Sequence, residues 1–291
     1  MGNIAGAKIQ ILNDMIPAAF DYQKVNTVEE AIKALSAPDS KILAGGQSLL
    51  PIMKLRLGQP SKLVDIVGIP GLHGIHEEDG EIVIGAATTH AEITRDKLVL
   101  EKLPFFSTAA GDIGDRQVRN HGTIGGSLAH ADPAADWPAL VLAADAGIEV
   151  QGPGKKRRIK STDFFKGLFS TDLSENEIIT AVRIPVPPAG TSSAYEKFSQ
   201  PASRFAIVGC AVMRFKDGKT NIAFSGVADT AFRDIGAEKI VSGKPLNDST
   251  ISAAMAAALK GILFLSDHYA SAEYREHLAR IFLKRALQAV A

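Results

Sequence analysis

The fold is decided by two stretches, TIGGSLAHADPAADWP at residues 123–138 and AGGQSLLP at residues 44–51. Each contains a glycine pair. The first stretch leads into an apolar segment that predicts a helix over 132–144, and the second follows a predicted strand at 41–44. Glycine has no Cβ atom, so its backbone can approach a ligand closely and adopt positive φ. Successive N–H groups in such turns form a concavity that binds anions, and a following helix N-terminus adds a favourable dipole.

Taken alone, either loop is equally well explained as a tight turn. Hydroxyl side chains that can donate to phosphate oxygens accompany both loops, at Ser48, Thr123 and Ser127. Two such loops favour a diphosphate held from both sides, as a dinucleotide cofactor requires. The established phosphate motifs are absent: no G-x-G-x-x-G joins a strand to a helix. The single G-K-T, at 218–220, has Met213 where a P-loop needs glycine, so it reads as a hairpin turn.

The chain divides into an N-terminal extension at 1–14, a βαβ unit at 15–71, a second mixed region at 72–188 and a C-terminal region at 189–291. Thr27 and Thr89 each precede a glutamate by three residues, which predicts helix capping. Prolines at 185–188 mark the last linker. Beyond it, alternating apolar residues predict a three-stranded antiparallel sheet, followed by helices that end with an amphipathic one over 271–290.

Composition limits the classes of protein that fit. Lysine plus arginine equals aspartate plus glutamate, at 32 each, which argues against a dedicated nucleic-acid binder. No apolar window is long enough for a membrane span, and no signal peptide is apparent, so we expect a cytoplasmic protein. With Cys210 as the single cysteine, neither a disulfide nor a cysteine-ligated cluster can form within this chain. We expect Cys210 to be a buried small apolar residue.

Longer segments around these loops carry a family resemblance. LAGGQSLLPIMKLRL at 43–57 and GTIGGSLAHADPAADWPAL at 122–140 resemble the two FAD motifs of the flavoprotein subunit of molybdenum hydroxylases. This is the xanthine dehydrogenase family, and the likeness extends to the medium subunit of carbon monoxide dehydrogenase-type enzymes. The segments at 17–32 and 267–287 resemble that subunit's start and its C-terminal helix. The resemblance implies an α+β fold: a two-subdomain FAD-binding domain of the PCMH type, then an antiparallel sheet with a helical bundle.

The resemblance also implies which residues contact FAD. No catalytic residue and no metal ligand is expected in this chain. The implied cofactor contacts are Leu43, Ala44, Gly45, Gly46, Gln47, Ser48, Leu49, Leu50, Ile113, His121, Thr123, Ile124, Gly125, Gly126, Ser127, Asp136, Ile179, Tyr195 and Lys197. Asp136 would accept hydrogen bonds from the ribityl or ribose hydroxyls. The nearby Asp132 is an alternative for that role, although it also fits a helix N-cap before Pro133.

Tyr195 and Lys197 point to the same face of a predicted strand. In the family, this strand places an aromatic or basic residue near the flavin ring. Tyr195 would then stack on the ring, unless it only packs at the domain interface. Lys197 would stabilise negative charge on the reduced flavin, unless it is an ordinary solvated lysine. Related subunits often carry a basic cluster after this strand, whereas this sequence has only Arg204.

Other polar groups in the sequence offer further candidate sites. His73 and His76 precede three acidic residues, but the glycines around them argue against a metal site. His121 and His130 flank the second glycine loop, where they would either touch the cofactor or bond to the backbone. The basic run at 155–158 beside a Gly-Pro-Gly turn is best explained as a solvated hairpin.

Finally, the resemblance implies partners. A large subunit with a molybdopterin cofactor would oxidise the substrate, and a small subunit with [2Fe–2S] clusters would pass electrons to FAD in this chain, in a dimer of heterotrimers. A free-standing FAD-dependent oxidase or dehydrogenase, and a non-catalytic nucleotide-binding assembly module, remain as alternatives. The sequence leaves open the substrate (carbon monoxide, an aldehyde, a purine or another N-heterocycle) and the terminal acceptor.

Overall fold

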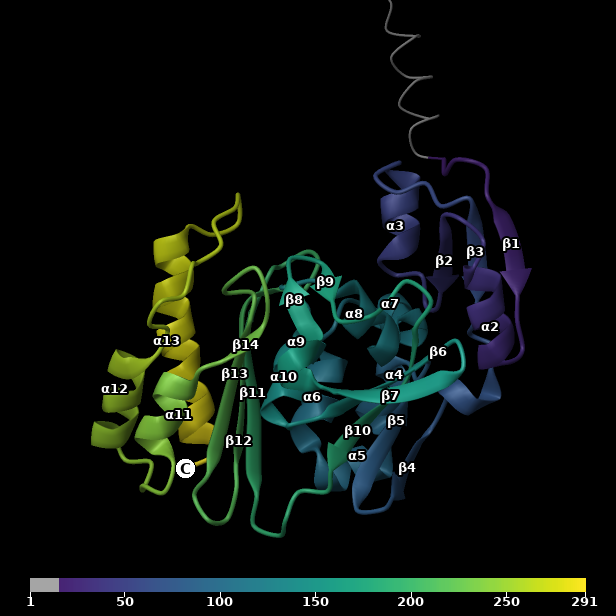
Figure 1. Cartoon of the computed structure of the whole chain (residues 1–291). Coiled ribbons are helices and arrows are strands. Elements are labelled where there is room, and N and C mark those ends of the chain that lie inside the picture. Colours follow the sequence, from purple (N-terminus) through teal and green to yellow (C-terminus); the bar gives the residue numbers. More distant parts are fainter. Residues whose placement is uncertain (1–15) are drawn as a thin grey trace, which may run out of the picture.

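The structure of the chain is a computed structural model that describes residues 16–291. The expected extension at 1–14 lies outside the described residues. Figure 1 shows three parts: a small N-terminal βαβ unit, a central sheet with helices, and a C-terminal sheet whose outer face is covered by helices. The predicted α+β fold class is confirmed.

The first part is a three-stranded parallel sheet in the order β1-β3-β2. Its elements are β1 (Asp21–Lys24), α2 (Val28–Leu35), β2 (Ser40–Leu43), α3 (Leu49–Lys54) and β3 (Lys62–Asp65). Helix α2 begins where predicted, because the Thr27 side chain accepts a hydrogen bond from the backbone N–H of Glu30. The first glycine loop connects β2 to α3 at the carboxyl end of the sheet, where ligand-binding loops of parallel strands usually lie.

The second part is a five-stranded antiparallel sheet in the order β4-β5-β10-β6-β7. Its strands are β4 (Ile75–Glu78), β5 (Glu81–Gly85), β6 (Gly147–Gly152), β7 (Lys155–Lys160) and β10 (Ile178–Pro185), with a short hairpin of β8 (Phe165–Gly167) and β9 (Ser170–Thr171). Its helices are η1 (Pro70–Leu72), α4 (His90–Arg95), α5 (Lys97–Lys102), α6 (Pro104–Gly111), α7 (Arg116–His121), α8 (Ile124–His130), α9 (Asp136–Ala143) and α10 (Ser161–Phe164).

The glycine-rich segment before α9 is more helical than the sequence suggested. It holds α7 and α8, and the helix predicted over 132–144 begins only at Asp136. Asp132 is therefore not the helix N-cap that we considered. Its side chain instead accepts from the backbone N–H of Ala134 and closes the turn before α9, while Ala135 is the N-cap residue. The helix starts late because this turn uses the residues that would have formed its first turn.

The third part is an antiparallel sheet in the order β11-β12-β13-β14. It consists of β11 (Ser192–Ser199), β12 (Ala206–Arg214), β13 (Thr220–Ser225) and the two-residue β14 (Phe232–Arg233), followed by α11 (Ile235–Val241), α12 (Asp248–Ala257) and α13 (Ala272–Ala289). The three predicted strands are present, and β14 adds a short fourth one. Cys210 is buried in β12, as expected.

The hydrophobic cores show how the parts are joined. The inner face of the C-terminal sheet, with Tyr195, Ala211, Met213 and Ala223, shares one core with Trp137 and the rest of the second part. Its outer face packs on α11, α12 and α13 in a separate core. A small third core joins the βαβ unit to Ala87 and Ile178 of the second part. The second and third parts thus form one packed body. The βαβ unit packs against this body and carries the first glycine loop.

Among the residues that the structure describes, no helix has both the length and the apolar character to cross a bilayer.

Candidate functional site

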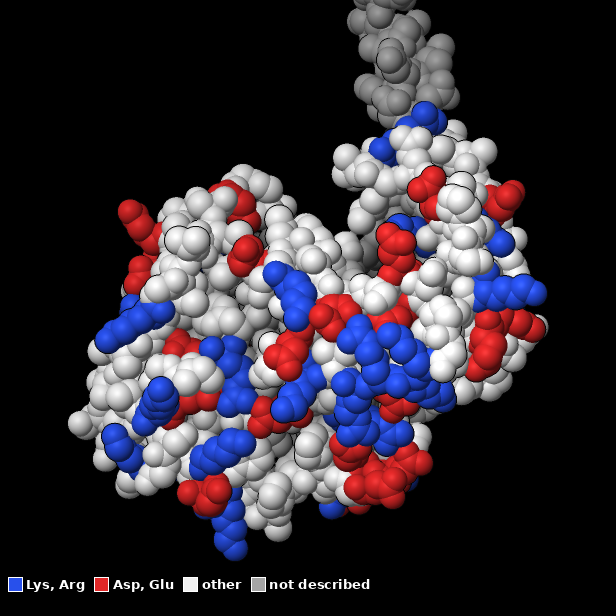
Figure 2. Space-filling view, in the orientation of Figure 1, with Lys and Arg blue, Asp and Glu red and all other residues white. Residues whose placement is uncertain are grey.

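The two glycine loops lie in contact with each other. A Cβ atom on Gly45 would collide with the carbonyl oxygen of His121 and lie 2.8 Å from the Cα atom of Gly122. One on Gly126 would lie 3.7 Å from the Cβ atom of Ala44. Figure 2 shows the surface hollowed between the βαβ unit and the rest of the molecule, and in Figure 1 α3 and α8, which follow the two loops, border this region. The predicted convergence of the loops is confirmed.

The first loop carries the unbonded backbone amides. Gly46 has φ +70°, which turns the chain between β2 and α3. Within the described part of the chain, no backbone acceptor or side chain takes the N–H groups of the residues from Gly45 to Leu49. The Gln47 side chain donates to the carbonyl oxygen of Gly45 at 3.1 Å and so braces the turn. Ser48 is the N-cap residue of α3 but makes no side-chain capping bond, which leaves its hydroxyl for a ligand.

The second loop is built differently, and one expectation about it is wrong. The backbone N–H groups of Ile124, Gly125 and Gly126 bond to Thr88 O (3.2 Å), Ala86 O (2.9 Å) and Thr123 Oγ1 (3.1 Å). These amides are therefore not free for a diphosphate. The glycines instead allow close packing, since a Cβ atom on Gly125 would lie 2.6 Å from that of Ala86.

The second loop therefore offers hydroxyl groups rather than amides. Thr123 is the N-cap residue of α8, and its oxygen accepts from Gly126 while its own proton remains to be donated. Ser127 follows one helical turn later and is partly exposed. We conclude that an anion at this junction would be held by amides of the first loop and by hydroxyls of both loops.

A buried histidine beneath the second loop was missed by sequence reasoning. The indole Nε1–H of Trp137 donates to Nδ1 of His90 at 3.1 Å, and both residues are buried. Burial, with a smaller contribution from Arg119, lowers the pKa of His90 to about 3, so the imidazole is neutral. A lone histidine at the start of a helix gives no sequence signal for this role, because its partner lies far along the chain.

Asp136 at the start of α9 is enclosed by residues of β11. One carboxylate oxygen accepts from the Tyr195 hydroxyl and the other from Lys197 Nζ at 3.0 Å. Burial raises the pKa of Asp136, while Lys197 and Tyr195 act in the opposite direction by favouring the charged form. Since both oxygens have protein partners, the carboxylate can reach a cofactor hydroxyl only through its remaining lone pairs.

Tyr195 and Lys197 are both buried. Tyr195 is 8% exposed and packs in the core between α9 and the C-terminal sheet, which agrees with interface packing. The side chain of Lys197 is 3% exposed, so it is not an ordinary solvated lysine. It also bonds to the carbonyl oxygen of Asp112 at 3.1 Å, and Asp112 in turn pairs with Arg204 at 2.9 Å.

The other predicted contacts are dispersed around this junction. His121 is exposed at the end of α7, with its carbonyl oxygen against Gly45. Ile113 is partly buried, and its carbonyl oxygen accepts from Arg119 at 2.9 Å. The side chain of Ile179 is buried in the core. The ring of His130 lies 5.1 Å from that of Phe169, an apolar residue at the β8–β9 tip that sequence reasoning missed.

The sequence predicts no metal site at His73 and His76. The ring of His73 bonds to the carbonyl oxygen of Val67 at 2.7 Å, so that nitrogen already has a protein partner. Within residues 16–291 no group of three or more potential ligands gathers around a common point.

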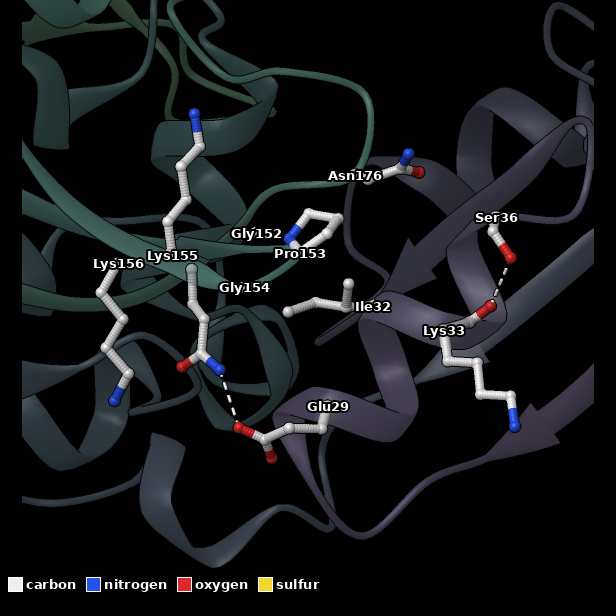
Figure 3. Close-up of a pocket in the computed structure, with 11 residues that line it drawn as sticks. Glu29, Ile32, Lys33, Ser36, Gly152, Pro153, Gly154, Lys155, Lys156 and Asn176 are labelled. Carbon is white, nitrogen blue, oxygen red and sulfur yellow. Dashed lines mark hydrogen bonds between the residues drawn. The ribbon is translucent and has the colours of Figure 1, made fainter.

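A separate groove of about 630 Å³ lies between α2 and the β6–β7 turn. Figure 3 shows Ile32 of α2 close to Pro153, with a hydrogen bond of 2.7 Å from the Gln151 side chain to Glu29 nearby. In the same view the ammonium groups of the lysines around the groove point away from it. It therefore presents no converging cationic groups to a diphosphate.

Known proteins resemble this chain over nearly its whole length. Residues 18–187 match the family model described as the FAD binding domain in molybdopterin dehydrogenase, and residues 193–290 match the CO dehydrogenase flavoprotein C-terminal domain. The carbon monoxide dehydrogenase medium chain of Hydrogenophaga pseudoflava is 41% identical, over 94% of this chain and 98% of its own length. The 6-hydroxypseudooxynicotine dehydrogenase complex subunit alpha of Paenarthrobacter nicotinovorans is 38% identical, over 94% of this chain and 95% of its own.

Solved structures agree with these matches. A structure of carbon monoxide dehydrogenase from Hydrogenophaga pseudoflava superimposes with a TM-score of 0.92 at 41% identity, over 95% of this chain and 98% of that chain. The fold and the site thus define an FAD-binding flavoprotein with oxidoreductase function. More particularly, the chain belongs to the family of medium, FAD-binding subunits of the molybdenum hydroxylases.

The residues at the loop junction fit the diphosphate of FAD. Five consecutive residues, Gly45 to Leu49, have amides without partners in the described chain, and hydroxyls stand on both loops. Amides in such a run supply several N–H donors directed at one anion without adding a full positive charge. The donor groups present are therefore consistent with FAD, the cofactor that the sequence predicts.

Proposed function

We propose that this chain is the FAD-containing electron-transfer subunit of a heterotrimeric molybdenum hydroxylase. In this proposal it takes electrons from the [2Fe–2S] clusters of a small subunit and passes them to a terminal acceptor. The support is the similarity to chains named as the medium chain or as one subunit of a dehydrogenase complex. The single cysteine, which rules out a cysteine-ligated cluster in this chain, makes partner subunits necessary for iron–sulfur chemistry.

The observation that carries the proposal is the contact between the two glycine loops. It brings the free amides of Gly45 to Leu49 next to the hydroxyls of Thr123 and Ser127. We infer that these groups hold the FAD diphosphate, with Leu43, Ala44 and Leu50 completing the first loop around it. Bound FAD supplies the capacity to store two electrons. The chain's own residues bind the cofactor and set its orientation.

We infer that the flavin end lies toward β11. Lys197 presents a buried ammonium group there, held by the carboxylates of Asp136 and Asp112 and by the carbonyl oxygen of Asp112. A cation in a site of low dielectric constant stabilises negative charge that develops nearby more strongly than one in water. Tyr195, Ile113, His121 and Ile179 remain predicted contacts, in which Ile179 would act through its backbone.

Purification of the complex from its native source tests the proposal. Mass spectrometry with metal analysis is expected to find a small subunit, a large subunit, iron and molybdenum with this chain, and the mass will check the predicted dimer of heterotrimers. Association with no iron or molybdenum would overturn the electron-transfer role. The cytoplasmic location expected from the sequence is checked by cell fractionation of the same material.

Expression of this chain alone separates the two alternatives. FAD-dependent turnover of a small reductant by the isolated chain would favour a free-standing oxidase or dehydrogenase. Material supplied with FAD that shows no flavin absorption would favour an assembly module. We expect bound flavin but no turnover until the partner subunits are added.

A further inference from the structure

A buried hydrogen bond lies directly beneath the point where the two loops meet. It joins Trp137 Nε1–H to His90 Nδ1 at 3.1 Å, and the two residues are 0% and 4% exposed. Because the indole nitrogen can only donate, Nδ1 must be the acceptor, and the single proton of the neutral imidazole is therefore on Nε2. The bond fixes the plane of the ring as well as its tautomer.

The other edge of the imidazole faces the second loop. A Cβ atom on Gly122 would lie 2.7 Å from Nε2 of His90, so only glycine lets the loop approach the ring this closely. The two segments are also joined along their backbones. His90 N–H donates to Gly122 O at 2.9 Å, Ile124 N–H donates to Thr88 O at 3.2 Å, and Thr89 forms a bridge with Thr123.

The first loop rests on the same glycine. A Cβ atom on Gly45 would lie 2.8 Å from the Cα atom of Gly122. The contacts therefore form one series, Trp137–His90–Gly122–Gly45, that leads from the core to the free amides of the first loop. If the imidazole ring moves, the backbone at Gly122 and then at Gly45 has to move with it, because neither glycine has a side chain that could adjust instead.

We propose that the His90–Trp137 pair is a positioning element that sets the two glycine loops at the separation required by the FAD diphosphate. This inference rests on the proposed function. An apolar pair of similar volume would fill the same space, but it would have no hydrogen bond to fix the orientation of its side chains. Since a buried N–H without a partner is costly, the hydrogen bond selects one orientation of both rings. Neither residue contacts the cofactor in this proposal, and both act through Gly122.

The test uses three variants of the full chain and two ligands. Trp137→Phe removes the donor. His90→Asn keeps an acceptor near the position of Nδ1 but withdraws the ring from Gly122. Phe164→Leu is the matched control, since Phe164 is a fully buried aromatic residue of the same core that belongs to α10, outside both loops. Dissociation constants for FAD and for ADP, which carries the diphosphate without the flavin, are measured well below the melting temperature of each apoprotein.

We expect the dissociation constants of Trp137→Phe and His90→Asn to rise about tenfold for FAD and for ADP alike, which is the effect of losing one well-made hydrogen bond. The double variant should lose no more affinity than the weaker-binding single variant, because both changes act on one unit. Phe164→Leu should stay within about twofold of the wild type despite a similar loss in melting temperature. An unchanged dissociation constant in Trp137→Phe, or an equal rise in Phe164→Leu, overturns the proposal.

A measurement on the wild type covers the case in which a variant does not fold. Trp137 is the single tryptophan, so its indole N–H gives one NMR signal in ¹⁵N-tryptophan-labelled apoprotein. We expect this signal to exchange slowly with D₂O and to shift when ADP is added. A signal that ADP leaves unmoved overturns the positioning role. Failure of the wild-type chain to bind FAD would instead refute the proposed function.

Discussion

The ammonium group of Lys197 lies 3.0 Å from a carboxylate oxygen of Asp136, and both side chains are almost fully buried. Lys197 belongs to β11 of the C-terminal sheet, whereas Asp136 is the first residue of α9 in the second part of the chain. The pair thus ties together two parts that are separated by the linker at 185–188. Buried ion pairs are retained only with good geometry and additional hydrogen bonds, which Tyr195 and the carbonyl oxygen of Asp112 supply here.

Breaking this pair from one side should be strongly destabilising. We expect Asp136→Asn or Lys197→Met to lower the free energy of unfolding by about 3–5 kcal/mol, because each leaves a buried charge without its nearest ionic partner. The double variant should lose less than the sum of the two. Urea unfolding of the apoprotein measures all three. The control is Lys102→Met, which breaks an exposed pair with Glu101 and should cost less than about 1 kcal/mol. Single variants as stable as the control would contradict this account.

Gly45 should not tolerate any side chain. In Gly45→Ala the new methyl group collides with the carbonyl oxygen of His121, so the two loops must separate. We expect a loss of about 1–3 kcal/mol in stability and a protein purified without flavin. The ratio of flavin absorbance to protein absorbance checks the second effect. Gly71→Ala is the matched control, because a Cβ atom there meets nothing within 4 Å and its φ is not positive. Full flavin content in Gly45→Ala would show that the loop contact is not needed.

His90 should make stability dependent on pH. Burial lowers its pKa from 6.5 to about 3 in the folded chain, so between these values the unfolded chain binds a proton that the folded chain does not. The contribution is fully present above pH 6.5 and is lost as the pH falls toward 3, with a slope of up to about 1.4 kcal/mol per pH unit. Unfolding free energies at pH 7 and pH 5 should therefore differ more for the wild type than for His90→Asn. An equal pH dependence in the two proteins would contradict a neutral, buried His90.

Cys210 should be chemically silent in the folded protein. It is fully buried in β12, and burial raises the pKa of its thiol well above the ordinary value, which disfavours the reactive thiolate. We expect a thiol reagent such as DTNB to react only at the rate of unfolding, and to label one thiol per chain at once in guanidinium. Rapid labelling under native conditions would show that the thiol is accessible to solvent, which contradicts its burial in the structure.

Part of the site could be read from the sequence because its signals are local. The glycine pairs, the hydroxyls beside them and the capping threonines act within a few residues, so the positions of both loops followed from composition and spacing. The same reasoning failed for the amides of Ile124 and Gly125. Their acceptors are the carbonyl oxygens of Thr88 and Ala86, about forty residues away along the chain, and no local pattern reports that.

By itself the sequence determined the family, the βαβ unit, the antiparallel C-terminal sheet and the two loops, since these depend on local periodicity and on motifs of adjacent residues. The tertiary structure alone decided which loop keeps free amides, that Lys197 is buried against Asp136, and that His90 bonds to Trp137 beneath Gly122. Those outcomes are set by packing between segments far apart in the chain. There the burial of a polar group depends on its partners, not on its neighbours in sequence.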